Sequence, residues 1–235
     1  HDDNFFVPHP PSNLKRYRQL ADCLAREGLT DIGLVIKCRP NDVGEELFSL
    51  LKQIGLIRAY VGIESNSREG LASLNRRISQ ADNRRALGIL DRLGIYHTFN
   101  LLLFDPEATL DCVRSNLDFM EEFASSPSNF CRAEVYAGTP LKDKLERQGR
   151  LTGSYLAWGY AMRSAPVEML FRIASTAFAP RNLKPDGIAS LNMGVRFDAE
   201  VLRRFYPDHA APGLQRQLEA LSREVALDSV AHLRR

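Results

Sequence analysis

Polar residues follow several short apolar runs, at points where a strand would end and a helix begin. In parallel α/β proteins such exits lie along one edge of the sheet, and chemistry gathers there. The side chains at these exits are Asp2, Asp3, Asn4, Cys38, Arg39, Glu64, Ser65, Asp105, Tyr136 and Thr139. Acidic and hydroxyl groups that converge on one edge can hold the hydroxyls of a sugar, an amino group or a metal ion.

Asn100 differs from these residues because it lies inside an apolar run. An amide there suits a strand that faces a polar barrel interior. Each of these polar residues also has a structural interpretation: Asn100 as a satisfied core amide, Ser65 as a helix N-cap, and Arg39 before Pro40 as a simple strand exit. Asp2 and Asp3 would then only cap the next element. The joint occurrence of polar residues at successive exits favours the functional interpretation.

The elements that position these residues alternate between helix and strand. Apolar runs predict strands at about 32–36, 59–63, 98–104 and 130–136, and amphipathic stretches between them predict helices. Ser12 and Asn13 are predicted N-caps, Asp42 and Glu45 have capping-box spacing, and Thr109 caps the helix after Pro106. The strands are apolar almost throughout, which is typical of parallel strands buried on both faces. The sequence therefore predicts an α/β fold, either a βα barrel or a doubly wound sheet.

The strand signal fades from about Tyr155. Stretches at 167–177, 199–206 and 214–233 predict helices separated by prolines. We therefore expect two regions, an α/β domain over 1–150 and a helical region over 151–235.

Composition excludes several classes of protein. The chain of 235 residues is 44% hydrophobic with a formal net charge of +2, which predicts a packed fold and neither nucleic acid nor an anionic membrane as a partner. Its four cysteines are widely spaced without a secretory signal, which predicts reduced thiols in a cytoplasmic protein. The common nucleotide-binding, hydrolase and zinc-protease motifs are absent.

Five short segments, in order, give the sequence its resemblance to a known family. They are His1–Phe5 (HDDNF), Tyr60–Ser65 (YVGIES) with Leu74–Arg76 and Asn83–Ala86, Leu103–Pro106 (LFDP) with Thr109, Tyr136–Leu141 (YAGTPL), and Gly149–Leu151. They resemble segments of radical S-adenosylmethionine (SAM) enzymes, in the branch that often carries a cobalamin-binding domain. The resemblance covers roughly residues 1–160.

The resemblance implies a partial (β/α)6 barrel that runs from the end of the second strand to the sixth. It implies SAM and a 4Fe–4S cluster as cofactors, with cobalamin as a further candidate, and a flavodoxin or ferredoxin as electron donor. The substrate would be a small or carrier-bound molecule that is methylated, cyclised or rearranged in specialised metabolism.

The resemblance also assigns site residues by position. Asp2 and Asp3 would lie near the amino-acid part of SAM, Glu64 with Ser65 at its ribose hydroxyls, and Asn100 with the segment up to Phe104 beside the adenine. Two further side chains complete the implied set: Tyr136 would lie at the rim of the last strand, and Arg39 would pair with a carboxylate.

The sequence departs from the family pattern in its cysteines. The cluster-binding CxxxCxxC is absent, so we expect the cluster ligands to lie upstream of His1 and this chain alone to be inactive. Phe104 also stands where the family usually has glycine, and an acidic residue is displaced to Glu107. Two alternatives remain open: a non-catalytic barrel module, and a barrel lyase that binds a divalent metal through Asp2, Asp3 and Glu64.

Overall fold

The computed structural model describes residues 4–235, and Asp2 and Asp3 lie outside them. The strands are β1 (Leu34–Cys38), β2 (Leu56–Glu64), β3 (His97–Phe104), β4 (Ser128–Arg132), β5 (Leu151–Ser154) and β6 (Ala157–Tyr160). The α-helices are α1 (Pro10–Arg26), α2 (Glu45–Gln53), α3 (Arg68–Ser73), α4 (Gln80–Arg92), α5 (Leu110–Glu122), α6 (Pro140–Arg147), α7 (Ala165–Ala177), α8 (Ile188–Phe205) and α9 (Leu214–Arg234). Three single-turn elements are η1 (Pro40–Asp42), η2 (Ala179–Leu183) and η3 (Pro207–His209).

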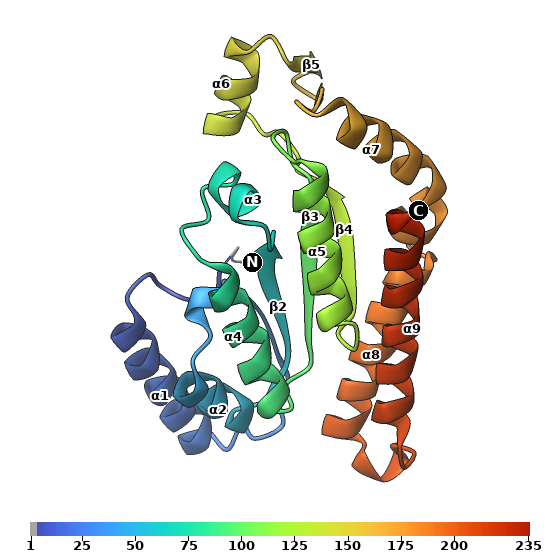
Figure 1. The fold of residues 1–235 in the computed structure, drawn as a ribbon. Helices are drawn as coiled ribbons and strands as arrows, with labels where there is room; N and C mark the ends of the chain where they lie inside the picture. The colour runs from blue at the N-terminus through green and yellow to red at the C-terminus, as the bar shows by residue number, and fades with distance from the viewer. Residues whose placement is uncertain (1–3) are drawn as a thin grey trace.

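Strands β1 to β4 form one parallel sheet in sequence order, β1-β2-β3-β4 (Figure 1). The register pairs Lys37 with Tyr60, Glu64 with Leu101, and Asn100 with Asn129. All four strands end at the same edge, so the predicted α/β fold with a parallel sheet is confirmed. The first three strands match the predicted runs closely. The fourth is shorter than predicted and ends at Arg132 rather than at Tyr136.

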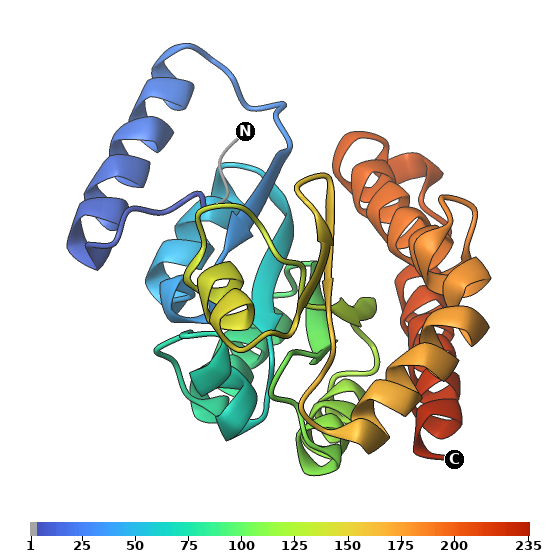
Figure 2. The same ribbon diagram turned by 90° about the horizontal axis from the view of Figure 1, so that it is seen from above.

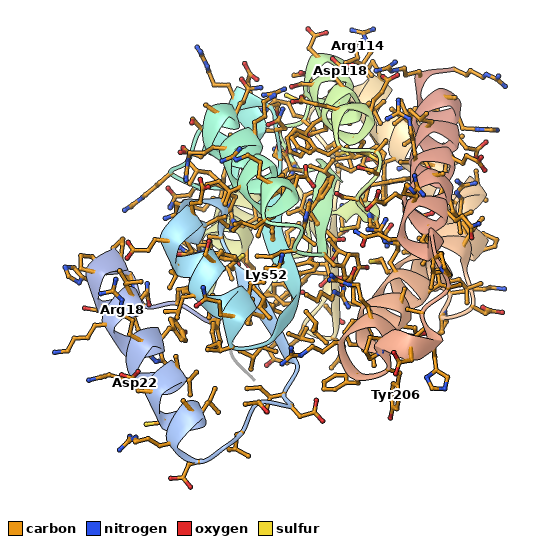
Figure 3. The ribbon with its side chains drawn as sticks, turned by 90° about the horizontal axis from the view of Figure 1, so that it is seen from below. Arg18, Asp22, Lys52, Arg114, Asp118 and Tyr206 are labelled. Carbon is orange, nitrogen blue, oxygen red and sulfur yellow. The ribbon has the colours of Figure 1, made fainter. Side chains whose placement is uncertain are left out.

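One face of the sheet is covered by helices α2, α4 and α5 (Figure 2). Along β2, side chains that point to these helices are fully buried, as are the matching ones of β3. Burial of this apolar surface contributes most of the stabilisation of such a layer. The core residues that fill it are Leu51, Ala59, Val61, Ile63, Leu87, Leu90, Phe99, Leu101, Leu103, Leu117 and Phe119. On the outside, α1 packs beside α2, where Arg18 pairs with Glu46 at 2.5 Å (Figure 3).

The other face of the sheet is partly open, contrary to the predicted burial of both faces. Val35 and Lys37 of β1 are exposed on it, and Tyr60, Gly62 and Glu64 of β2 are half-buried there. We call this the open face. At the amino ends of the strands it is covered by α8, whose Phe197 lies 5.9 Å from the Arg58 guanidinium. The carboxyl ends of the strands carry the uncovered part.

Residues 151–235 contain more than helices. The chain first forms the antiparallel hairpin β5–β6, which the sequence analysis did not predict, and then helices α7, α8 and α9. The hairpin strands have four residues each, too short for a recognisable alternation. Helix α9 packs against α5 and α8, so the carboxyl-terminal helices lie beside the sheet (Figure 1).

Helix caps confirm one prediction and correct two. Thr109 accepts a hydrogen bond from the Cys112 backbone N–H, as predicted. The cap of α1 is His9 rather than Ser12 or Asn13, because Pro10 already begins the helix. Asp42 caps η1 by accepting from the Arg39 N–H at 2.9 Å, so it does not begin α2.

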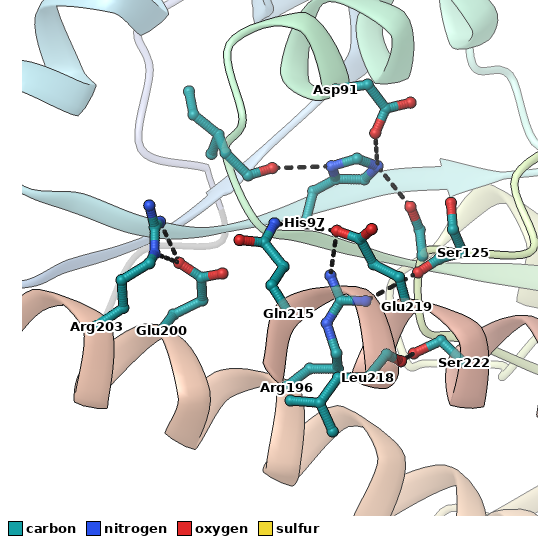
Figure 4. Close-up of polar contacts among 12 residues, drawn as sticks. Asp91, His97, Ser125, Arg196, Glu200, Arg203, Gln215, Leu218, Glu219 and Ser222 are labelled. Atoms are coloured by element: carbon teal, nitrogen blue, oxygen red, sulfur yellow. Dashed lines mark hydrogen bonds and ion pairs between the residues drawn. The ribbon is translucent and has the colours of Figure 1, made fainter. Parts of the chain in front are cut away.

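A buried polar cluster joins the amino end of β3 to the carboxyl-terminal helices (Figure 4). His97 Nδ1 lies 3.1 Å from the Ile95 carbonyl, so it must donate, and Nε2 accepts from the Ser126 hydroxyl at 2.9 Å. Arg196 of α8 donates to the Ser125 carbonyl at 3.2 Å and lies 3.8 Å from Glu219 of α9. The geometry holds His97 as neutral imidazole at the junction.

This cluster predicts a pH-dependent stability. Burial lowers the pKa of His97 and Arg196 lowers it further, while Asp91 and the Ile95 carbonyl oppose the shift. The unfolded chain then binds more protons below about pH 6.5, so acidification destabilises the fold by at most roughly 1.4 kcal/mol per pH unit. We expect the free energy of unfolding, measured in urea between pH 7 and 5, to fall more for the native chain than for His97→Gln. Parallel slopes would contradict this assignment.

Gly55 is a second test of the fold. Its φ is +107°, and an added Cβ would lie 2.4 Å from the Ile32 carbonyl oxygen. We expect Gly55→Ala to cost about 3 kcal/mol, since it adds backbone strain to a collision that side-chain rotation cannot relieve. Gly28 is the matched control, with φ +66° and no atom within 4 Å of its added Cβ. Gly28→Ala should cost only about 1 kcal/mol. Equal losses in denaturant titration would contradict this close approach in the turn before β2.

Candidate cofactor-binding site

The candidate site lies where β2 ends on the open face. Alternation along the strand puts Tyr60, Gly62 and Glu64 on this face, while Ile63 points into the helix-covered core. Asn100 of β3 and Cys131 of β4 lie on the same face, as the register across the sheet requires. A carboxylate at the end of β2 and a phenol, an amide and a thiol from β2, β3 and β4 thus share the open face of three adjacent strands.

The backbone at this exit is strained. Glu64 has φ +62°, and Asn75 and Arg77, on the segment that follows β2, have φ +50° and +53°. These are the positive-φ residues other than glycine within 4–235, and all three lie from the last residue of β2 to the loop before α4. A left-handed backbone conformation costs about 1 kcal/mol or more for a residue with a long side chain, such as Glu64. Residues strained in this way cluster at functional sites.

Arg76 folds back from this segment onto the strand. Its guanidinium donates to the Gly62 carbonyl at 2.5 Å, and its buried Nε–H finds no acceptor among the described residues. A Cβ on Gly62 would lie 3.2 Å from Glu64 Oε1 and 3.3 Å from Arg76 Nη2. Because Gly62 has no side chain, the Glu64 carboxylate and the Arg76 guanidinium can both lie close to the strand on the open face.

Burial governs the electrostatics of the site. It raises the pKa of Glu64, and the nearby Arg76 partly offsets that rise. Burial and the charge of Glu64 also raise the pKa of Tyr60 to about 12 and that of Cys131 to about 11, with Glu134 adding to the second shift. Tyr60 and Cys131 are consequently neutral hydrogen-bonding groups. Hydrogen bonds to the Glu64 carboxylate are stronger here than in water.

Ser65 points away from Glu64. It is fully buried, and its hydroxyl lies 3.2 Å from Ser67 Oγ and 3.4 Å from Asn116 Oδ1. Asn116 also accepts from the Asn66 backbone N–H at 2.5 Å. Ser65 and Asn116 thus hold the strained turn through hydrogen bonds on its buried side. A contact of Ser65 with a cofactor stays a prediction.

The other predicted residues are spread along the edge. Asn100 lies on the open face, close enough to Tyr60 to lower the pKa of its phenol, and Glu64 acts on the same phenol. Arg39 is exposed at the β1 exit. Phe104 is buried with its ring 5.4 Å from that of Phe171, and Tyr136 is exposed and donates to Glu134. The structure therefore brings Glu64 and Asn100 together and leaves Arg39, Phe104 and Tyr136 further along the rim.

Metal and cluster ligands are scarce in the described chain. Within residues 4–235, no three His, Cys, Asp or Glu side chains lie close enough to share a metal ion. Cys23 is exposed on α1, Cys38 and Cys112 are buried, and Cys131 stands alone on β4. These four thiols do not fit a 4Fe–4S cluster, which needs several thiolates converging on one site. The proposed metal ligands Asp2 and Asp3 lie outside the described residues.

Within residues 4–235, no helix has the length and apolar character needed to cross a membrane.

Arg76 and Gly62 are the site residues to which the sequence analysis assigned no role. Both lie within the segments that carry the family resemblance. Hydrophobic periodicity could not have identified them, because Arg76 reaches the site only through the positive-φ residues on either side of it. The one signal in the sequence is that Asn75, Arg76 and Arg77 follow the strand that ends at Glu64, which indicates a basic partner for this carboxylate.

Comparisons with known proteins show which folds and sequences this chain is similar to. No protein-family model matches the sequence. A curated protein of Pyrococcus horikoshii described as an uncharacterized methyltransferase is 26% identical over 140 residues, which are 60% of this chain and 29% of that protein. The cobalamin-dependent SAM radical enzyme OxsB, with aqua-cobalamin bound, aligns with 99% of this chain at TM-score 0.71 and 14% identity.

A second solved structure is the radical SAM methyltransferase TsrM from Kitasatospora setae, with tryptophan and a SAM analogue bound. It aligns with 68% of this chain at TM-score 0.52 and 19% identity. The chain spans 38% of OxsB and 33% of TsrM, so it matches about a third of these enzymes. At these identities the likeness establishes the fold: a parallel α/β sheet with helices, similar to that of cobalamin-dependent radical SAM enzymes.

The hydrogen bonds of Asn116 with Ser65 and Asn66 can be tested by mutation. Asn116→Ala would leave the Asn66 N–H and the Ser65 hydroxyl without their buried acceptor, so we expect a loss of about 1–3 kcal/mol in unfolding free energy. The control is Asp118→Ala on the outer side of the same helix, whose Arg234 partner is solvent-exposed (Figure 3). That variant should lose less than about 0.5 kcal/mol. Equal losses in urea titration would mean that Asn116 does not support the turn.

Proposed function

We propose that this chain is the SAM-binding part of a radical SAM enzyme of the cobalamin-associated kind. Its parallel sheet would be part of a (β/α)6 barrel, and the open face would be the barrel interior. The observation that carries the proposal is Glu64, held in a left-handed conformation with its carboxylate half-buried at a strand end. The fold similarity to OxsB and TsrM supports it.

The residues of the site suit SAM in three respects. The Glu64 carboxylate is a pure acceptor and can receive both hydroxyls of a ribose diol. Gly62 lets the Glu64 carboxylate and the Arg76 guanidinium lie close to the backbone of β2, because a Cβ there would crowd both of them. The Arg76 Nε–H is a buried donor without an acceptor in residues 4–235, so a small rearrangement on binding would satisfy it.

The adenine side of the site would be formed by β3. Asn100 offers an amide on the open face, close to the Tyr60 side chain. Leu102, half-buried on the same face, provides an apolar surface for a planar base. Phe104 packs against Phe171 instead, so its part would be to shape the rim rather than to touch the base.

SAM, once bound in an enzyme of this kind, supplies a radical for methylation, cyclisation or rearrangement of an organic substrate. The contribution of this chain would be positioning and shielding. Glu64 and Asn100 fix the nucleoside part, and Ser65 and Asn116 hold the turn that aims Glu64. Helix α8 covers the opposite end of the open face and limits access of water from that side. We assign no cluster ligand to the described residues.

Replacing Glu64 tests this proposal. We expect Glu64→Ala to weaken SAM binding by about 10- to 100-fold, the effect of removing hydrogen bonds to a charged group. The control is Glu69→Ala, an exposed carboxylate five residues further along on α3, which should bind SAM as the native protein does. The measurement is equilibrium dialysis of labelled SAM with the protein expressed from its complete reading frame. Unchanged affinity in a folded Glu64→Ala protein would refute the assignment.

A further inference from the structure

A cavity of about 760 Å³ lies between the end of β4, the β5–β6 hairpin and helix α7. Aromatic rings form a large part of its walls, and we call it the aromatic cavity, after the rings of Phe130, Tyr155, Trp158, Tyr160, Phe171 and Phe178. Its volume falls within the range of sites for small organic ligands. Aromatic walls favour flat, ring-bearing ligands, because rings stack face to face or edge to face.

The apolar surface around the cavity is exposed. Leu156 at the hairpin tip is 92% exposed, Tyr155 is 75% exposed, and Leu183 of η2 is 66% exposed. All three line the aromatic cavity. Clustering of exposed apolar side chains around one hollow, rather than singly over the surface, marks a binding site.

One cation lies in the wall of the aromatic cavity. The Arg132 guanidinium lies 3.6 Å from the centroid of the Tyr160 ring and 4.8 Å from that of Phe171, and it donates to the Tyr160 carbonyl. Within residues 4–235 it forms no ion pair, although it lies near enough to Glu168 to help lower the pKa of that carboxyl, and the Glu134 carboxylate also lines the cavity. Since the two rings already hold this guanidinium in place, little side-chain entropy is lost when it binds an anion.

The aromatic cavity adjoins the proposed SAM site. Phe104 and Cys131 line it, and both belong to the strand ends next to Glu64. Cys131 is also close enough to Glu64 for the carboxylate to raise the pKa of its thiol. A molecule in the cavity would therefore lie beside the ligand held by Glu64.

We propose that the aromatic cavity is the substrate site, and that it takes a flat, mostly apolar ring system with one anionic substituent directed at Arg132. Its identity as the substrate site rests on the proposed function, whereas its capacity to bind such a molecule does not. The volume and the ring-lined walls fit a small molecule.

The chain carries its own probe for this cavity, because Trp158 in its wall is the sole tryptophan. Anilinonaphthalene sulfonate has two aromatic ring systems and one anionic group, and it accepts energy from excited tryptophan. We expect it to quench Trp158 saturably, with one probe bound per chain. Saturable probe fluorescence without any change in Trp158 emission would overturn the proposal.

Two variants of α7 separate this cavity from other apolar surface. Ser175 and Thr176 are both exposed, and each hydroxyl donates to the Arg172 carbonyl, at 3.0 and 3.1 Å. Only Ser175 lines the aromatic cavity. We expect Ser175→Phe to weaken probe binding at least about tenfold by filling the cavity, and Thr176→Phe to leave it unchanged. Equal affinities in the two variants would refute the site.

The charge preference has its own test. We expect Arg132→Gln to lower the affinity for anilinonaphthalene sulfonate about tenfold, while binding of the uncharged phenylnaphthylamine changes less than about threefold. Equal losses for both probes would refute the anionic substituent.

A cross-comparison distinguishes failure of this proposal from failure of the proposed function. Ser175→Phe should retain SAM binding, and Glu64→Ala should retain probe binding. A protein that binds the probe at Trp158 but gives the same SAM affinity with and without Glu64 refutes the SAM site alone. The reverse pattern refutes the aromatic cavity alone.

Discussion

Parallel pairing of β1 to β4 is the constraint on which the rest of the molecule depends. Because all four strands run the same way, their exits lie at one edge, and polar residues such as Arg39, Glu64 and Asp105 are delivered there. The helices that return the chain cover one face only, so the alternation of β2 divides its side chains between a dry core and the open face. Ile63 and Glu64 are neighbours in sequence but belong to these two environments. A parallel sheet of this kind thus produces both the stability and the location of the site.

Stability and site are coupled at the turn after β2. Glu64 adopts a left-handed backbone that its side chain disfavours, and the adjoining Ser65 is fully buried in hydrogen bonds with Ser67 and Asn116. The same burial raises the pKa of Glu64, while Arg76 offsets part of the rise. The core thereby supports an arrangement that an isolated segment would not keep, and it does so where a ligand would bind.

The sequence predicted the architecture better than the details of the site. Apolar runs located three strands closely, and the shared edge followed from their parallel arrangement. The hairpin β5–β6 was not predicted, because strands of four residues are too short to show an alternation of apolar and polar residues. The opposite directions of Ile63 and Glu64 follow from alternation, but the partner that holds the buried Ser65, Asn116, lies some fifty residues away and gives no local signal. Arg76 and the aromatic cavity depend on tertiary packing, which no spacing rule describes. For Arg76 it is the packing of the loop before α4, and for the cavity it is the packing of α7 against β3.

The central claim is that Glu64 holds the ribose of SAM. The most direct measurement is a crystal structure of the protein, expressed from its complete reading frame, with SAM bound. The account predicts that both ribose hydroxyls lie within hydrogen-bond distance, about 2.5–3.0 Å, of the Glu64 carboxylate. Over the open face, the adenine should lie beside Asn100. A structure in which SAM binds elsewhere, or in which Glu64 contacts only protein atoms, would contradict the account.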